Sequence, residues 1–328
     1  MNEWWVDVNR SINFNEALTF PTRENDIFAV GELLVDMMSE MYDDNITNTS
    51  YRKLFGGSPA NIAMNVMRLG IYANIASAVG EDAFGTFLID KLKIAGIDTG
   101  CVQRNDYSTS MVVVTKSRST PIPIFYRGAD YQLMYTKVIE EALLNSKIVH
   151  FSCWPISMAP ARQTIEKMIA IAKENQILIG FDPNYHPLIW QRGEEGLQYI
   201  KSMLKNVDIV KPSEVDAERL FGKDTYENQI EKFLELGVKL VIMTLGKDGA
   251  IVSNGQNTLR FDSLASEVVD TTGAGDAFWS GFYTAIVQGY TVKEALSLGF
   301  AVSAYKLQHT GAVIELPRLE VIKQLYSL

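Results

Sequence analysis

Residues 270–278 read Asp-Thr-Thr-Gly-Ala-Gly-Asp-Ala-Phe, and an apolar run without proline follows them as far as Val287. This run predicts a helix that Gly289 can end. Residues 273–276 then form the helix start, where backbone N–H groups have no partner within the helix. These donors and the positive end of the helix dipole favour an anion. A carboxylate at such a place suits a base that takes a proton from a hydroxyl while the donors hold a transferring phosphate.

The Gly-Ala-Gly-Asp sequence also fits other kinds of local structure less specific than a catalytic site. An ordinary tight turn with an acidic residue near the helix start would have the same residues, and this alternative stays open on the stretch alone. The glycines do not have the G-x-G-x-x-G spacing of a dinucleotide site. Gly222-Lys223 and Gly246-Lys247 are each followed by Asp, so the sequence has no G-x-x-x-x-G-K-[ST] phosphate loop.

The composition is typical of a soluble globular protein, because 47% of the 328 residues are hydrophobic and 21% are charged. A net charge of −9 argues against a general nucleic-acid binder, which needs a basic face. The two cysteines, Cys101 and Cys153, cannot form a disulfide framework. No apolar run reaches the roughly 18 residues of a membrane span. We therefore expect a cytoplasmic protein with neither a nucleic-acid nor a membrane partner.

Short apolar runs alternate with helical segments along most of the chain. This alternation predicts a doubly wound α/β fold, in which helices cover both faces of a mainly parallel sheet. Residues 1–26 follow no clear period and are predicted to form an N-terminal extension to a domain over residues 27–328. The expected strands lie at residues 27–31, 75–79, 148–151, 177–182, 207–210 and 240–244.

Polar residues follow several of these strands. A parallel sheet binds ligands beyond the carboxyl ends of its strands, so these residues predict a site at one edge of the sheet. Each of these residues taken alone is explained by a helix cap or a turn. A site is favoured only because such residues follow several of the strands. The residues are Asp36, Asp182-Pro183-Asn184, Lys211-Pro212-Ser213-Glu214 and Gly246-Lys247.

Residues 56–61, Gly-Gly-Ser-Pro-Ala-Asn, are the second informative stretch. Ser58 can cap a helix, and Pro59 suits the first helical position. The paired glycines allow a ligand to approach the backbone closely. Asn61 offers both a hydrogen-bond donor and an acceptor beside them.

Residues 56–61, residues 270–276 and the α/β pattern between them resemble the ribokinase-like, or PfkB, family of carbohydrate kinases. The resemblance extends from about Ile27 to Pro317. It implies transfer of the γ-phosphoryl group of ATP to a sugar hydroxyl with Mg²⁺, and it leaves open a monovalent cation as a further activator. It also implies a small β-sheet lid from about residues 34–55 and 99–126. A lid sheet has open edges and an apolar face, so we expect it to close over the sugar and to pair with a second subunit's lid in a homodimer.

The resemblance assigns a role to individual residues. Asp276 takes the position of the base, and Gly273, Ala274 and Gly275 take those of the anion hole. Glu214 takes a magnesium position, through water. The sugar-binding positions fall on Asp36, Gly56, Gly57, Asn61, Arg127, Asn184 and His186, and the ATP-binding positions on Lys211, Thr244, Gly246 and Lys247.

Three residues depart from the pattern of many relatives. Lys211 stands where an Asn is usual, His186 where fructokinase-type relatives have Arg, and Phe300 where several members place an Asn near the adenine. Because His186 is largely neutral above its ordinary pKa of about 6.5, the expected acceptor is a neutral ketohexose such as fructose. An acidic sugar, 5-dehydro-2-deoxygluconate or 2-keto-3-deoxygluconate, is the alternative, with Arg127 on its carboxylate. A catalytically silent sugar sensor is the alternative from outside the enzymes.

Overall fold

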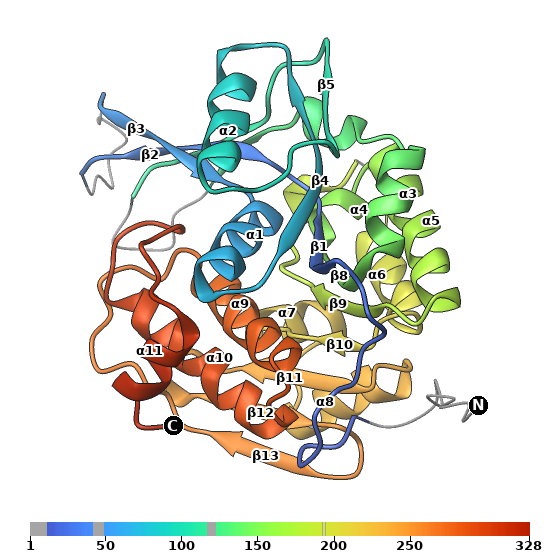
Figure 1. The fold of residues 1–328 in the computed structure, drawn as a ribbon, viewed down its shortest axis with the longest axis vertical. Coiled ribbons are helices and arrows are strands. Elements are labelled where there is room, and N and C mark those ends of the chain that lie inside the picture. Colours follow the sequence, from blue (N-terminus) through green and yellow to red (C-terminus); the bar gives the residue numbers. More distant parts are fainter. Residues whose placement is uncertain (1–11, 42–48, 117–122, 192, 194) are drawn as a thin grey trace.

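The computed structural model describes residues 12–41, 49–116, 123–191, 193 and 195–328. Among them, a nine-stranded sheet forms the centre of the molecule (Figure 1), and it is parallel except where β12 pairs with β11 and β13. The prediction of a mainly parallel sheet is confirmed. In spatial order the strands are β13 (Thr258–Phe261), β12 (Ala250–Ser253), β11 (Leu240–Thr244), β10 (Ile209–Val210), β9 (Leu178–Asp182), β8 (Ser146–Ser152), β1 (Asn25–Val30), β4 (Ala73–Gly80) and β5 (Val102–Asn105).

Alternating side chains of β1 show how the sheet holds two layers of helices together. Ile27 and Ala29 join one hydrophobic cluster, while Phe28 and Val30 join the other. The first cluster includes side chains of α1 (Ser58–Leu69), α2 (Ala83–Ile94), α9 (Ala274–Val287), α10 (Val292–Leu307) and α11 (Leu319–Leu325). The second includes side chains of α3 (Lys137–Leu144), α4 (Cys153–Ile156), α5 (Ala161–Glu174), α6 (Gly196–Leu204), α7 (Glu214–Phe221) and α8 (Tyr226–Glu235).

A separate four-stranded sheet projects from the main body (Figure 1). Its spatial order is β3 (Tyr51–Gly56), β2 (Leu34–Ser39), β6 (Met111–Val114) and β7 (Ile124–Tyr126). It corresponds to the expected lid, with one difference. Strand β5 pairs with β4 in the large sheet, so the second lid segment begins at Met111 rather than near Thr99. Residues 42–48 and 117–122 of the expected lid lie outside the described residues.

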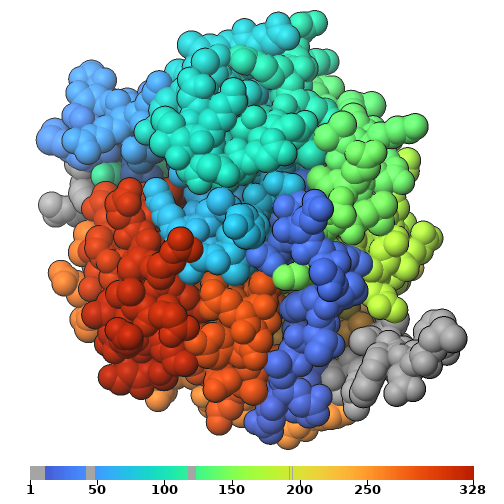
Figure 2. All heavy atoms as spheres, in the orientation of Figure 1, coloured from blue at the N-terminus to red at the C-terminus, as the bar shows by residue number. Residues whose placement is uncertain are grey.

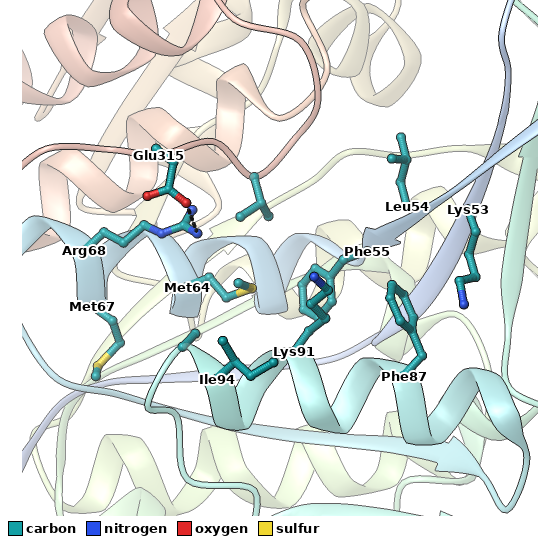
Figure 3. A pocket seen from close by; sticks show the side chains of 12 residues that line it. Lys53, Leu54, Phe55, Met64, Met67, Arg68, Phe87, Lys91, Ile94 and Glu315 are labelled. Carbon is teal, nitrogen blue, oxygen red and sulfur yellow. Dashed lines mark ion pairs between the residues drawn. The ribbon is translucent and has the colours of Figure 1, made fainter.

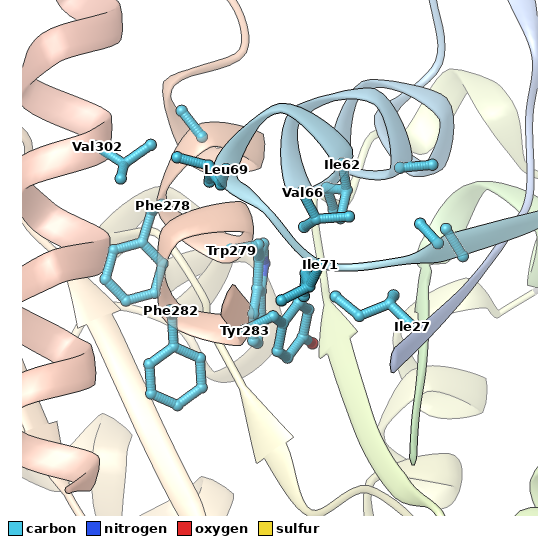
Figure 4. Packing of buried hydrophobic residues seen from close by; sticks show 14 of the residues in the cluster. Ile27, Ile62, Val66, Leu69, Ile71, Phe278, Trp279, Phe282, Tyr283 and Val302 are labelled. Carbon is cyan, nitrogen blue, oxygen red and sulfur yellow. The ribbon is translucent and has the colours of Figure 1, made fainter. Parts of the chain in front are cut away.

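Helices α1 and α9 pack against each other on the same face of the large sheet (Figure 4). Val66 and Leu69 of α1 lie in one cluster with Phe278 and Trp279 of α9. Burying an aromatic side chain of this size contributes about 1.5–3 kcal/mol. The contact brings the N-terminal turns of the two helices together, and these turns carry the two sequence stretches that resemble the kinase family.

The N-terminal segment packs on its own chain over residues 12–24. Ile12 and Phe14 are buried, and the Phe14 carbonyl accepts a hydrogen bond from the Lys293 amide at 2.8 Å. Figure 2 shows this segment in blue beside the orange C-terminal part of the chain. Phe14 is therefore part of the core of its own chain. Residues 1–11, with Trp4 and Trp5, lie outside the described residues.

Candidate active site

A cavity of about 430 Å³ lies between the small sheet, the start of α1 and the start of α9. Its walls combine residues from segments far apart in the sequence. Nine of the predicted site residues line it: Asp36, Gly57, Asn61, Asn184, Lys211, Thr244, Gly273, Gly275 and Asp276.

The start of α9 lies beside the ammonium group of Lys211. Gly273 is the N-cap, with φ 75°, and a Cβ there would lie 2.8 Å from the Ala312 Cα. A Cβ on Gly275 would lie 3.3 Å from the Lys211 Nζ, so this ammonium group sits against the first turn. Lys211 is held by an ion pair of 2.9 Å with Asp182. Helix N–H groups and an ammonium group together suit a phosphate.

Asp276 lies in the first turn of α9 and is held by two donors from α1. The Ser58 hydroxyl donates to Oδ1 at 2.6 Å, and the Asn61 amide donates to Oδ2 at 2.8 Å. Burial raises the pKa of Asp276 to about 6, against the lowering effect of these two hydrogen bonds. The carboxylate is therefore ionised at neutral pH but remains basic enough to accept a proton.

Helix α1 begins one residue earlier than the sequence predicted. Gly57 is its N-cap with φ 109°, and a Cβ there would lie 2.3 Å from the Glu32 carbonyl oxygen. The left-handed region and this close approach both require glycine. Ser58 is thus the first helical residue rather than the cap, and its hydroxyl is free to bind Asp276.

Asp36 on β2 faces the cavity across from Asp276. Gly56, which does not itself line the cavity, makes room for it, because a Cβ on Gly56 would lie 2.3 Å from the Asp36 carboxylate. Burial and the nearby charge of Asp276 raise the pKa of Asp36 to about 7. Asp36 is therefore about half protonated at neutral pH and can both donate to and accept from a hydroxyl.

The two expected sugar-binding cations do not line the cavity. Arg127 forms an ion pair of 2.6 Å with Asp130, donates to the Ser157 hydroxyl at 2.9 Å, and is only 9% exposed in its side chain. His186 packs on Phe125 with its ring 5.0 Å away, and its Nδ1 accepts from the Leu188 amide. Burial, helped by Arg219, lowers the pKa of His186. Trp154, on which Arg127 stacks at 4.5 Å, lines the cavity instead.

The expected nucleotide and metal residues are only partly brought together. Thr244 ends β11 and lines the cavity, but Gly246 and Lys247 are exposed in the turn η3 (Gly246–Asp248). Glu214 accepts from the Tyr226 hydroxyl at 3.2 Å and does not line the cavity. Ala274 is the first residue of α9 and is likewise absent from the lining.

Several polar or aromatic residues line the cavity although the sequence assigned them no individual role there: Glu32, Ser58, Trp154, Asp182 and Asp216. The sequence showed Asp182 only as a carboxylate at a strand end, and Asp216 lies two residues past the Lys211-Pro212-Ser213-Glu214 stretch. Carboxylate oxygens such as those of Asp182 and Asp216 are the ligands that Mg²⁺ takes beside phosphate. Phe300 packs between the rings of Phe261 and Phe278.

A second cavity, of about 620 Å³, lies between α1, α2 and β3 (Figure 3). Its wall is mostly apolar, with Phe55 and Phe87 on opposite sides and an ion pair between Arg68 and Glu315 at one end. None of the residues predicted for the site lines it. The predicted site residues that line a cavity are therefore all in the smaller of the two.

A basic carboxylate, a helix start that suits phosphate and a hydroxyl-binding wall define a phosphotransferase with an alcohol group as acceptor. Residues 24–319 match the pfkB family of carbohydrate kinases. The chain belongs to this family and is a sugar kinase, so the proposal of a silent sensor is set aside.

Three similar proteins illustrate the family. The ATP-dependent 6-phosphofructokinase of Thermoanaerobacterium thermosaccharolyticum is 57% identical over 316 residues, covering 96% of this chain and 98% of the relative. The solved fructokinase of Halothermothrix orenii is 41% identical, with a TM-score of 0.75 over 84% of this chain and 97% of that one. A putative ribokinase II of E. coli, solved with ATP and Mg²⁺, is 26% identical, with a TM-score of 0.80 over 92% of this chain and 99% of that one.

Among the described residues, none of the helices is both long and apolar enough to cross a membrane.

Proposed function

We propose that this chain transfers the γ-phosphoryl group of ATP to a hydroxyl of a fructose-type ketohexose, with Asp276 as the base. The observation that carries the proposal is the position of Asp276 in the first turn of α9, held by Ser58 and Asn61. Its carboxylate takes the hydroxyl proton as the sugar oxygen attacks phosphorus and the bond to the ADP oxygen breaks. The N–H groups of Gly273 and Gly275, which line the cavity, and the Lys211 ammonium stabilise the charge on the phosphoryl oxygens.

Mg²⁺ fits the carboxylates on the wall beside α9. Asp182 and Asp216 both line the cavity. Oδ2 of Asp182 already binds Lys211 and Trp279, and both oxygens of Asp216 accept from Tyr185 and Ser213, so the two carboxylates would hold the ion through its waters. The ion would neutralise charge on the phosphates of ATP. A role of Glu214 through water stays a prediction, as does activation by a monovalent cation.

The first candidate for the acceptor is fructose 6-phosphate. It is favoured by the 57% identity over nearly the full length of the relative that is named for this substrate. The cavity wall formed by Asp36, Asn61 and Asn184 offers donors and acceptors for the hydroxyl groups of a ketose.

Free fructose is the second candidate, favoured by the charges at the site. The only cation among the described residues that line the cavity is Lys211, which pairs with Asp182. Arg127 is likewise engaged by Asp130. A sugar phosphate or an acidic sugar has no other cation in this wall for its charge. The 41% identity to a fructokinase points the same way.

A coupled ADP-release assay distinguishes the candidates. We expect kcat/KM for fructose 6-phosphate to exceed that for fructose by at least about tenfold, or about 1.4 kcal/mol. The reverse order would support fructose. A preference for either acidic sugar would overturn both candidates. His186→Arg serves as the control variant, since His186 does not line the cavity and the substitution should leave the order of the acceptors unchanged.

A further inference from the structure

Glu32 follows strand β1 and reaches the floor of the active-site cavity. It is only 5% exposed, and it lines the cavity. Its Oε1 accepts a hydrogen bond from the Ser58 amide at 3.0 Å. Its Oε2 is buried and has no hydrogen-bond partner within the described structure. A buried polar oxygen without a partner costs about 1–3 kcal/mol, so its position calls for a ligand.

The contacts of Glu32 continue to the base. Ser58 gives its amide to Glu32 and its hydroxyl to Asp276 at 2.6 Å. The Glu32 carbonyl also lies against Gly57, where a Cβ would be 2.3 Å away. The backbone and side chain of Glu32 together fix the first turn of α1, and this turn holds Asp276.

We propose that Glu32 binds the acceptor sugar as a neutral carboxylic acid, with Oε2–H donating to a sugar oxygen while Oε1 holds Ser58 in place for Asp276. This inference rests on the proposed function, because it concerns the same acceptor. Glu32 takes no part in the phosphoryl transfer described above, and the inference gives its carboxyl group a role in binding the sugar.

The surroundings of Glu32 favour the neutral form. Burial above all, together with the carboxylates of Asp130 and Asp276, raises its pKa to about 8, against the backbone hydrogen bonds of Glu32 and Ser58. Cys153 on α4 faces the same region, and burial raises the pKa of its thiol. Asp36 lines the opposite wall. A second ionised carboxylate here would repel the base, whereas a neutral acid adds a donor.

Two substitutions test the proposal. In Glu32→Gln, the amide oxygen can accept from Ser58 and the NH₂ group can donate as Oε2–H does. Glu32→Ala loses both interactions. At pH 7 we expect Glu32→Ala to lower kcat/KM for the sugar by about 10²-fold or more, with KM for ATP within about threefold of wild type. Glu32→Gln should restore most of this loss.

The pH profile separates this role from a merely structural one. Wild-type kcat/KM for the sugar should fall as pH rises through about 8, because Glu32 loses its proton. Glu32→Gln cannot ionise and should lack this decline. Ser58→Ala keeps the amide that Glu32 binds but removes the hydroxyl on Asp276, so it should lower kcat and keep the decline.

Three results would overturn the proposal: a decline above pH 8 that persists in Glu32→Gln, a glutamine variant as impaired as the alanine variant, or an alanine variant with wild-type kinetics. If Glu32→Ala fails to fold, as its melting curve would show, the glutamine variant still decides. Failure of the proposed function is distinguishable, since wild type would then phosphorylate none of the ketohexoses.

Discussion

Asp276 combines a raised proton affinity, which comes from burial, with a fixed orientation, which comes from its contacts with α1. The pKa of about 6 is high enough for proton transfer and low enough for ionisation at pH 7. Ser58 and Asn61 each bind a different carboxylate oxygen, so the group cannot turn away from the acceptor.

We expect Asp276→Asn to lower kcat by about 10²–10⁴-fold and to leave ATP binding nearly unchanged, because only the proton acceptor is lost. Steady-state kinetics and ATP titration measure these effects. The surface variant Asp224→Asn, in a pair with Lys232, is the control and should be neutral. Near-wild-type kcat in Asp276→Asn would remove Asp276 from the role of base.

The same carboxylate predicts two pH effects. Wild-type kcat/KM should fall as pH drops below about 6, where Asp276 becomes protonated. The folded-state pKa is above the ordinary 3.8, so Asp276 makes the fold less stable as pH rises from about 4 to 6. Asp276→Asn should therefore melt at a higher temperature than wild type at pH 7, as calorimetry can check.

The sequence correctly placed Asp276 in the first turn of a helix, because a carboxylate in a Gly-Ala-Gly helix start is a local pattern. It could not pair Asp276 with Ser58, since 218 residues separate them and a helix cap explained Ser58 equally well. It also assigned Arg127 to the sugar, because nothing in the local sequence shows that Asp130 engages the guanidinium group.

The start of α9 depends on a left-handed residue at its cap. Gly273 has φ 75° and Gly289, just past the end of the same helix, has φ 87°. A Cβ on Gly289 would meet nothing within 4 Å, whereas one on Gly273 would lie 2.8 Å from the Ala312 backbone. Alanine would therefore strain the backbone at both positions, but only at Gly273 would its Cβ also collide with Ala312.

We expect Gly289→Ala to lower the free energy of unfolding by about 1–2 kcal/mol, with little effect on kcat. Gly273→Ala should lower it further and also reduce kcat, because the N–H donors at the helix start must move. Urea denaturation and steady-state kinetics measure the pair. Equal losses of stability and of kcat in the two variants would contradict this account of the anion site.

The elements themselves were largely predictable, since the buried strands are continuous apolar runs and α9 is an uninterrupted helical segment. Strand β5 was not predictable, because Val102–Asn105 carries a single hydrophobic residue. It belongs to the large sheet because it pairs with β4. The beginning of α1 was missed by one residue, since the positive φ of Gly57 comes from its contact with Glu32.

Among the described residues, the small sheet has no strand paired beyond β3 or beyond β7. The β3 edge carries the charged Arg52 and Lys53, which discourage pairing, whereas Ile124 and Tyr126 on β7 are 53% and 51% exposed. We therefore expect a homodimer that pairs through this sheet. The expectation is independent of the chemistry in the cavity.

Sedimentation velocity at micromolar concentration should show a dimer for wild type and a monomer for Ile124→Lys. Ile94→Lys is the control, because Ile94 is 81% exposed on α2 and lies away from the β7 edge. A wild-type protein that sediments only as a monomer, with and without sugar, would contradict the expected homodimer. If both variants were monomeric, the dimer interface would have to lie on a surface other than the β7 edge.

The N-terminal segment beside α10 has a consequence for biosynthesis. The carbonyls of Phe14 and Glu16 accept hydrogen bonds from the amides of Lys293 and Val292. The hydrogen bond from Ser58 to Asp276 also joins distant residues, which lie 218 positions apart. At about 5–20 residues per second, a ribosome needs on the order of ten seconds or more to make the partner of either contact. The nascent chain must therefore keep Phe14 and the first turn of α1 unpaired until α9 and α10 have emerged. Activity can appear only at the end of translation.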